Sequence, residues 1–486
     1  MPHYTVVVCS MEPMRIKRIL RMIGGQRKGS RGMTDKKKWS LWALAWPIAI
    51  EMLLQFLMGS VDTLMVSHIS DYASSAVGLS NQVLNATSVM FMLINSGAGI
   101  VIAQKLGAGK AEQARRTAAI TIKANLAVGA ILSLFIFYYA DWLLGFMQAP
   151  EQVLPLAGTY LRIVGSNTIV LSLYAASSAI IRNTGNTRAP MLIVMGMNVI
   201  HLVLNYAFIY GAFGFPEWGI LGVSISTVVS RTAALICSLA VMFKAFQPGF
   251  VKSDWKGFDK ALVKEVWRIG WPMSINAASW NYSQAIIFAM VASMGAASLA
   301  SYTYMNTIQS LPWLVGMSVA MASQIRVGHL YGTRSFEACY RSAYTALWSG
   351  LAYVVMTSLV LWLAGRTALG WFTSDVEVLK IAVPLLAVNV LLQPLKMVNQ
   401  AFSFSLNAVG DTRFTAATNM ASMWLVAAAC SYYFGIALGW GITGIYTAMI
   451  LDEAIRGILV AVRWKKRGRL KSPAENVSLG QKQVSL

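Results

Sequence analysis

Long apolar segments recur along the whole chain and restrict its fold more than any other feature. Twelve of them are long enough, as helices of about 20 residues or more, to cross roughly 30 Å of hydrocarbon. Because a backbone inside lipid must satisfy its own hydrogen bonds, they predict an all-α integral membrane protein with twelve transmembrane helices. The predicted spans are 41–66, 76–103, 117–140, 153–181, 189–213, 219–243, 265–292, 299–325, 342–364, 379–408, 414–437 and 440–462.

The composition and the placement of charge agree with this class. Hydrophobic residues make up 56% of the chain and charged residues 12%, whereas soluble proteins carry about 25% charged residues. The formal net charge of +21 comes largely from lysines and arginines in every second connection between spans. The positive-inside rule then predicts a multi-pass protein of the cell (plasma) membrane with both termini cytoplasmic. We expect these cations to contact anionic lipid, and we expect no nucleic-acid partner.

Sequence motifs for metal binding, cofactor binding and catalysis do not appear. The four cysteines are far apart, in no ligand-like spacing. The Gly109-Lys110 pair lacks the glycine five residues earlier and the following Ser or Thr of a phosphate-binding loop. We therefore expect no metal, no cofactor and no enzymatic activity.

The two halves of the chain repeat each other. Trp46-Pro47 recurs as Trp271-Pro272, and GNTR at 185–188 recurs as GDTR at 410–413, both 225 positions later. Six helices per half make the two lobes enter the membrane in the same sense, so a pseudo-twofold axis runs along the membrane normal and substrate is expected between the lobes. The predicted divisions are a basic cytoplasmic segment 1–38, an amino-terminal lobe 39–243, a cytoplasmic loop 244–264, a carboxy-terminal lobe 265–462 and a basic tail 463–486.

Polar side chains lie at helical spacing within several spans, and residues spaced in this way share one face of a helix. Facing lipid they would be unsatisfied, so they either hydrogen-bond between helices, at about 0.6 kcal/mol per bond, or line a hydrated cavity. We predict a substrate cavity lined by Glu51, Gln55, Asn81, Asn85, Trp280, Gln284, Tyr302, Asn306, Gln309, Gln393, Lys396 and Gln400.

Ionisable residues inside the spans are treated separately, because a charge at mid-membrane costs at least about 2.5 to 3.5 kcal/mol. Asp62 shares a face with Glu51 and Gln55 and either takes up and releases a proton or serves as a neutral hydrogen-bonding group. Glu51 is equally compatible with a buried pair inside its lobe, and His201 with a titrating group or a hydrogen-bonded spacer. For Lys396 three roles are predicted as alternatives: it forms an ion pair with a carboxylate, it attracts an anionic substrate, or it repels cations.

A second set of charged residues occupies equivalent places in the sixth and twelfth spans. These are Arg231, Asp452 and Glu453, and we interpret them as pairs that stabilise each lobe.

The motifs together resemble those of the multidrug and toxic compound extrusion (MATE) family. They comprise Trp-Pro at the start of each half, MGSVDTLMVS at 58–67, QKLGAGKAEQARR at 104–116, RNTGNTR at 182–188, WGILGVSISTVVS at 218–230, QIRVGHLYGTRSFEACYR at 324–341 and NAVGDTR at 407–413. The resemblance covers roughly residues 38–462. It implies an exporter that exchanges cytoplasmic drugs or metabolites, usually cationic and aromatic, for protons or sodium ions.

The resemblance also assigns residues. The family's cation-coupling aspartate falls on Asp62, the coupling positions of the fifth and sixth helices fall on His201, Asn205 and Thr227, and the proline implicated in bending the first helix falls on Pro47. His201 departs from the family's acid or amide pattern, which disfavours a sodium site and favours protons.

Some members carry further acids in the seventh and tenth helices, where this chain has Trp280 and Lys396. Coupling by those acids is therefore not expected. The lysine instead indicates tolerance of anionic or zwitterionic substrates, and the resemblance suggests flavin-like molecules, which some relatives export.

The sequence thus predicts a secondary active efflux transporter that works by alternating access and proton antiport, less favourably by sodium antiport. The alternative is a lipid-linked precursor flippase of the same broad superfamily, for which Lys396 and Arg162 would supply basic character. The expected partners are a small-molecule substrate, aromatic cation or flavin-like, the coupling ion and membrane lipid, and the expected state is a monomer.

Overall fold

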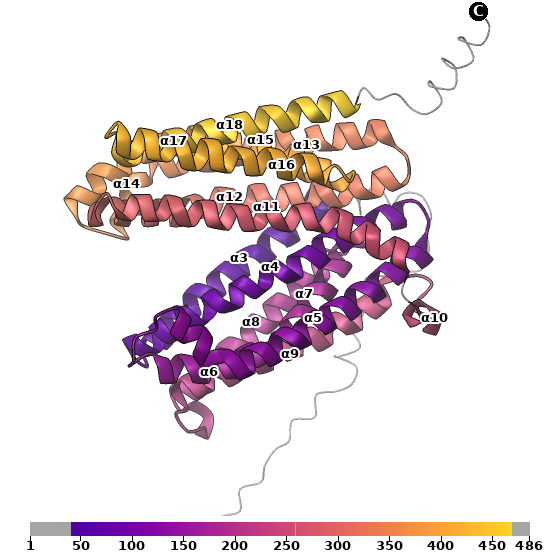
Figure 1. Cartoon of the computed structure of the whole chain (residues 1–486), viewed down its shortest axis with the longest axis horizontal. Helices are drawn as coiled ribbons and strands as arrows, with labels where there is room; N and C mark the ends of the chain where they lie inside the picture. Colours follow the sequence, from indigo (N-terminus) through magenta and orange to yellow (C-terminus); the bar gives the residue numbers. More distant parts are fainter. Residues whose placement is uncertain (1–39, 258, 469–486) are drawn as a thin grey trace, which may run out of the picture.

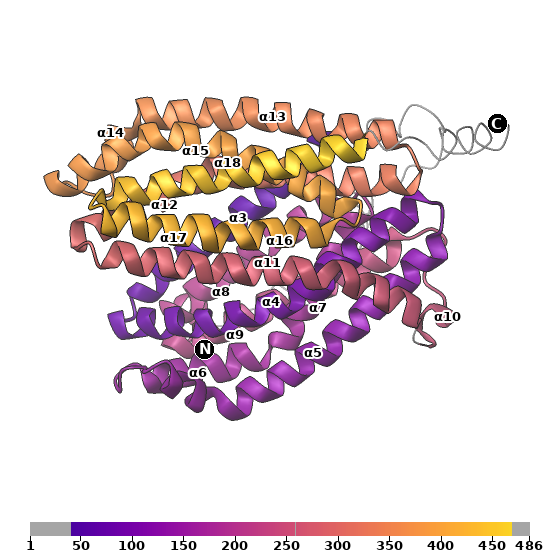
Figure 2. The same cartoon turned by 45° about the horizontal axis from the view of Figure 1, so that its top comes forward.

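The structure, a computed structural model, describes residues 40–257 and 259–468. The predicted segment 1–38 and residues 469–486 of the predicted tail lie outside this range. Within it the chain forms two helical bundles, one from each half of the sequence (Figures 1 and 2). The prediction of an all-α membrane protein with twelve transmembrane helices in two lobes is confirmed.

The amino-terminal lobe consists of α3 (Leu41–Ser67), α4 (Asp71–Gly107), α5 (Ala111–Phe146), α6 (Leu154–Ser166), α7 (Thr168–Asn183), α8 (Arg188–Ile209) and α9 (Gly219–Ala245), with the short η1 (Ala212–Gly214). The carboxy-terminal lobe consists of α11 (Lys260–Ala292), α12 (Ala296–Gly332), α13 (Phe336–Leu363), α14 (Gly365–Gly370), α15 (Val376–Ala408), α16 (Thr412–Ser422), η2 (Met423–Ala428), α17 (Ala429–Ser431), η3 (Tyr432–Ala437) and α18 (Gly441–Gly468). A short helix, α10 (Lys252–Trp255), lies in the connection between the lobes.

The helices of this set differ in how apolar they are. In the described residues eight helices are long and apolar enough to cross a membrane, and the bent pair α6 and α7 makes a ninth span. The helices α11, α12 and α18 have 33, 37 and 28 residues but are less apolar. In α12 and α18 polar side chains such as Gln309 and Asp452 are buried inside the protein. They lower the mean hydropathy of these helices without facing the lipid.

The fourth predicted span, 153–181, is broken in the structure. Helices α6 and α7 meet at an angle of 46° around Asn167. The hydroxyl groups of Ser166 and Thr168 donate to the carbonyls of Ile163 and Gly165, at 3.0 and 2.6 Å. Such short side-chain bonds to the backbone compete with the helical hydrogen bonds and favour a bend.

The sequence repeat is also a repeat of backbone geometry. Gly185 and Gly410, the glycines of the recurring motif, have φ of 87° and 82°. A further pair of similar segments, WGILG at 218–222 and WGITG at 440–444, behaves in the same way: Trp218 stacks on Phe208 with ring centroids 4.8 Å apart, and Trp440 stacks on Phe434 at 5.4 Å. The same turns therefore end equivalent helices in both lobes.

The two lobes meet at the end of the molecule where α4 and α12 finish and α5 and α13 begin. We call this the basic end, because Lys105, Lys110 and Arg334 lie there. The start of α3 packs into a core shared with α12, α13 and α15, through Leu44 and Ile48 among others. In Figure 1 the bundles are close together at the end that carries α10 and diverge toward the end that carries α14.

Glycines allow the closest approach of the lobes. A Cβ atom on Gly270 of α11 would lie 2.0 Å from the carbonyl oxygen of Leu93 in α4, and one on Gly97 would lie 2.3 Å from that of Val266. Gly107 and Gly332 are equally tight, since added Cβ atoms would lie 2.1 Å from the carbonyl oxygens of His329 and Gln104. Only residues without a side chain fit at these positions.

Polar contacts across the same junction follow the internal repeat. Gln104 Nε2 donates to the Ala408 carbonyl at 2.7 Å, and His329 Nε2 donates to the Asn183 carbonyl at 2.8 Å. Both donors and both acceptors are 225 positions apart in the sequence. Each lobe thus binds the carbonyl-rich end of a helix of the other, and the ion pair Lys105 to Glu265, at 2.8 Å, adds a further link.

Candidate functional site

The carboxylate of Asp62 lies in a hydrogen-bonded group within the amino-terminal lobe. Asp62 Oδ1 is 2.8 Å from His201 Nε2 and accepts a bond from Asn205 Nδ2 at 3.1 Å. His201 and Asn205 are four residues apart on α8, so one face of that helix presents both to α3. The structure therefore brings together Asp62, His201 and Asn205.

Helix α9 supports these two side chains from behind. Ser230 Oγ lies 3.2 Å from His201 Nδ1, and Ser226 Oγ donates to Asn205 Oδ1. The second bond orients the amide, because the oxygen faces the serine and the NH₂ group then faces Asp62. Sequence reasoning missed both serines, although their spacing of four on a helix would have placed them on one face.

Thr227, the fourth predicted coupling residue, lies in the same region but does not bond Asp62 among the described contacts. Its hydroxyl donates to the Val223 carbonyl at 2.8 Å. It also lies in hydrogen-bonding reach of the buried Tyr160 of α6, another residue that the sequence did not single out. A role of Thr227 in cation coupling stays a prediction.

Exposure differs sharply within the pair at the centre. The Asp62 side chain is 29% exposed and that of His201 is 3% exposed. A proton on His201 Nε2 is donated to Asp62, and a proton on the Asp62 carboxyl group is donated to Nε2, so one pair of atoms accommodates both arrangements. The partly exposed member of the pair is the carboxyl group.

Glu51 lies deeper in the same lobe than its shared face with Asp62 suggested. Its side chain is buried, and its Oε1 is 3.2 Å from Arg182 NH1 on α7. This is the alternative of a buried acid paired within its lobe. Contact of Glu51 with substrate stays a prediction.

The other residues predicted to line a cavity divide into exposed and buried groups. Gln55, Asn81, Asn85 and Trp280 are exposed. In the carboxy-terminal lobe, Gln393 donates to Asn389 at 2.9 Å and to Gln309 at 3.4 Å, while Gln309 donates to Asn306. Among the remaining predicted cavity residues of this lobe, the Tyr302 hydroxyl donates a hydrogen bond to Gln284 Oε1 at 3.4 Å. These groups bond one another inside their lobe, as interhelical hydrogen bonds do.

Lys396 lies near a buried group of charges in the carboxy-terminal lobe. Arg456 pairs with Asp452 and, at 2.8 Å, with Glu453, and Lys396 is in electrostatic reach of all three. The interpretation of Asp452 and Glu453 as members of a lobe-stabilising group fits these contacts. Arg456 was missed, although its spacing of three and four from the acids on one helix indicates such pairs.

The remaining predicted residues are separate from this group. Arg162, which sequence reasoning offered as support for a basic cavity, pairs with Asp141 and is half exposed. Gln400 is partly exposed on α15, and Pro47 lies inside α3, where its ring removes a backbone hydrogen bond.

Comparison with known proteins decides the family. The MatE family model matches the chain twice, at residues 47–207 and 272–433, so the two matches begin 225 residues apart. The chain belongs to the MATE family of transporters. The resemblance found in the motifs is confirmed, and the double match reproduces the internal repeat.

Two bacterial relatives align over most of this MATE chain. The uncharacterized transporter YisQ of Bacillus subtilis (strain 168) is 34% identical over 431 residues, which cover 89% of this chain and 95% of the relative. The probable multidrug resistance protein NorM of Thermotoga maritima is 26% identical, covering 88% and 93%. A crystal structure of MATE in the bent conformation shares the fold, with a TM-score of 0.79 at 19% identity and coverage of 92% and 97%.

Proposed function

We propose that this MATE protein is a secondary active efflux transporter that exports drugs or metabolites in exchange for protons, with Asp62 as the coupling carboxyl group. The observation that carries the proposal is the bond of 2.8 Å between Asp62 Oδ1 and His201 Nε2 within a membrane-spanning lobe. A carboxyl group in a span is costly, so such groups are rare and usually pair with another residue or mark a functional site. Here it has both a partner that can hold a proton and partial exposure.

The chemistry favours protons over sodium ions. A sodium site requires several oxygen ligands, and His201 brings a nitrogen to Asp62 where a carboxylate or amide oxygen would serve. The Asn205 oxygen is already bonded by Ser226. A proton needs only the carboxyl group and an acceptor, which the pair supplies.

The proposed cycle follows alternating access, with the positive-inside rule assigning the basic end to the cytoplasm. In the conformation described, the lobes are closed at the basic end through the glycine contacts. Protonation of Asp62 from the outside neutralises it and changes the hydrogen bonds of His201 and Asn205. Release of substrate outward and reopening of the basic end then complete the exchange.

The available driving force sets the scale of export. One proton that crosses the full membrane potential supplies about 2.3 kcal/mol per 100 mV, which corresponds to a substrate gradient of about fiftyfold. For the substrate we propose aromatic cations or flavin-like molecules, supported by exposed Trp280 and by the names of the relatives as multidrug resistance proteins. We further propose a monomer in the cell membrane with cytoplasmic termini.

Transport in proteoliposomes tests the proposal. Wild type is expected to export a cationic dye under a pH gradient, and Asp62→Asn is expected to lose this coupling while it still binds the dye. Asp71→Asn is the matched control, because Asp71 is exposed at the start of α4 and makes no ion pair among the described residues. Equal pH-driven export by Asp62→Asn and wild type would contradict the proposal, and transport driven by a sodium gradient alone would contradict the choice of ion.

A further inference from the structure

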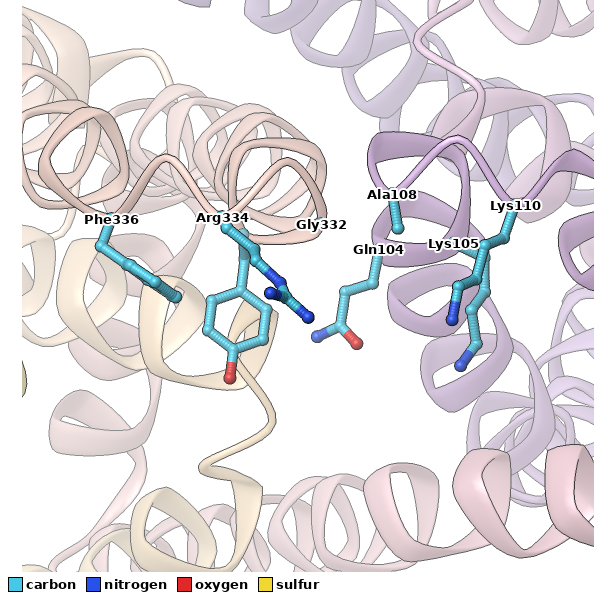
Figure 3. A pocket seen from close by; sticks show the side chains of 8 residues that line it. Gln104, Lys105, Ala108, Lys110, Gly332, Arg334 and Phe336 are labelled. Atoms are coloured by element: carbon cyan, nitrogen blue, oxygen red, sulfur yellow. The ribbon is translucent and has the colours of Figure 1, made fainter. Parts of the chain in front are cut away.

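A basic pocket lies between the two lobes at the basic end, outside the site described above. Its volume is about 230 Å³, and both lobes line it. Gln104, Lys105 and Lys110 come from the end of α4 and the turn after it, and Tyr331, Arg334 and Phe336 come from the equivalent turn after α12. Figure 3 shows the side chains of Arg334 and Gln104 extending toward each other between the lobes, with Lys105 and Lys110 beyond Gln104 on the side of the amino-terminal lobe.

The basic side chains that line the pocket are only partly neutralised by acidic side chains. Lys105 pairs with Glu265 at 2.8 Å. Within residues 40–257 and 259–468, neither Lys110 nor Arg334 has an acidic partner within 4.0 Å. Two cations from opposite lobes are therefore available to an anion.

The backbone at Arg334 is a second and independent observation. Its φ is 59°, a left-handed conformation that glycine adopts readily and that side chains with a Cβ atom disfavour. In the first half of the repeat, 225 positions earlier, the equivalent turn residue is Gly109, with φ of 73°. The second turn thus has an arginine where the turn itself favours glycine, and strained residues of this kind concentrate at functional positions.

Residues beside the cations suit a phosphate group with an attached organic part. Tyr331 carries a hydroxyl donor, and its ring meets that of Phe336 edge to face at 5.8 Å. Lysine and arginine side chains are the usual donors to phosphate oxygens, and arginine can bind two of them at once. The aromatic rings provide apolar surface next to that position.

We propose that this pocket binds a phosphate-bearing anion and that the bound anion favours the conformation in which the lobes are closed at the basic end. Lys110 and Arg334 belong to different lobes, so separation of the lobes removes one of them from the anion. A ligand that binds one conformation better than the other shifts the equilibrium toward it. The headgroup of an anionic phospholipid and a soluble phosphate compound share this chemistry.

Binding is tested first with inorganic pyrophosphate and the purified full chain in detergent, by titration calorimetry. Arg334→Gly is the informative variant, because glycine fits the left-handed turn and the substitution removes the whole arginine side chain with its guanidinium group. We expect about tenfold weaker binding, the size of one charge-assisted hydrogen bond. Arg413→Gln, an exposed cation at the start of α16 outside the pocket, is the matched control and is expected to bind as wild type does.

Hydrogen–deuterium exchange then separates the two sources of phosphate. If the headgroup binds, peptides over 105–110 and 331–336 exchange more slowly in nanodiscs of phosphatidylglycerol than in nanodiscs of phosphatidylcholine. If a soluble anion binds, pyrophosphate slows their exchange in phosphatidylcholine nanodiscs. In Arg334→Gly either effect is expected to be smaller than in wild type under the same conditions, in line with the weaker binding.

The proposal is overturned if neither addition slows exchange, or if Arg334→Gly binds pyrophosphate and responds as wild type does. Binding does not depend on the proposed function, whereas the preference for one conformation rests on its alternating access. The Asp62→Asn variant distinguishes the two, because a failure of proton coupling there is expected to leave pyrophosphate binding unchanged.

Discussion

The substitution Gly270→Ala tests whether glycine contacts hold the lobes closed at the basic end. The added Cβ atom would lie 2.0 Å from the carbonyl oxygen of Leu93, where ordinary contact begins at 3.4 Å. The backbones of α4 and α11 must therefore separate locally by about 1.4 Å. Neither partner can rotate away, because the obstructing atom belongs to the backbone.

The cost of this overlap falls mainly on the closed conformation. Overpacking of a well-packed contact costs typically about 1 to 3 kcal/mol. If the open conformation relieves it, the closed-to-open ratio falls by roughly one to two powers of ten. We therefore expect Gly270→Ala to fold, to populate the conformation open at the basic end, and to transport more slowly than wild type.

Hydrogen–deuterium exchange in nanodiscs measures this shift. Peptides that contain 93–97 and 266–270 are expected to exchange faster in Gly270→Ala than in wild type. Gly196→Ala in α8 is the matched control, because a Cβ atom there meets nothing within 4 Å. Equal exchange of the two variants in both peptides would refute the reasoning.

Three further predictions concern buried contacts. Arg115→Met leaves the buried carboxylate of Asp254, in the inter-lobe connection, without its partner at 2.8 Å. Thermal unfolding should show that the free energy of unfolding falls by about 3 to 5 kcal/mol. The control is Arg116→Met, which should lower it by less than about 1 kcal/mol because its partner Glu112 is exposed. Arg456→Met should destabilise the carboxy-terminal lobe by a similar amount, about 3 to 5 kcal/mol, and neutralising its partners with Asp452→Asn and Glu453→Gln should restore part of the thermal stability; no restoration would argue against the pairing. Ser226→Ala removes the bond that orients Asn205 and should slow pH-driven export severalfold, whereas Ser224→Ala, whose hydroxyl donates only to the Ile220 carbonyl in its own helix, should not; equal export rates would exclude this orienting role.

Much of the architecture was predictable because it depends on local sequence. Each apolar segment needs only its own length and composition to become a membrane helix, and the recurring Trp-Pro and Gly-x-Thr-Arg motifs identify the duplication without any contact. The break at Asn167 was missed because an average of hydropathy over a span hides local features such as the hydroxyl groups of Ser166 and Thr168, which bond the backbone on either side of it.

The candidate site was predictable only in part. Asp62 and His201 stand out as ionisable residues in spans, and the resemblance to the MATE motifs assigned them and Asn205 to cation coupling. The structure places polar atoms of the three side chains within 3.1 Å of one another. The burial and the partners of Glu51 and Gln393 were not predictable, because helical spacing shows which residues share a face of a helix but not what packs against that face. Both are buried among partners of their own lobe.

The sequence by itself determined the class of the protein, its twelve spans, its internal repeat and its family, because hydropathy, charge and motif order are properties of the chain. Tertiary structure decided which polar residues are partners and how the lobes meet. The glycines at 97, 107, 270 and 332 are ordinary helix residues in the sequence. Only the packing of α4 against α11 and α12 shows that a single Cβ atom at those positions would force the lobes apart.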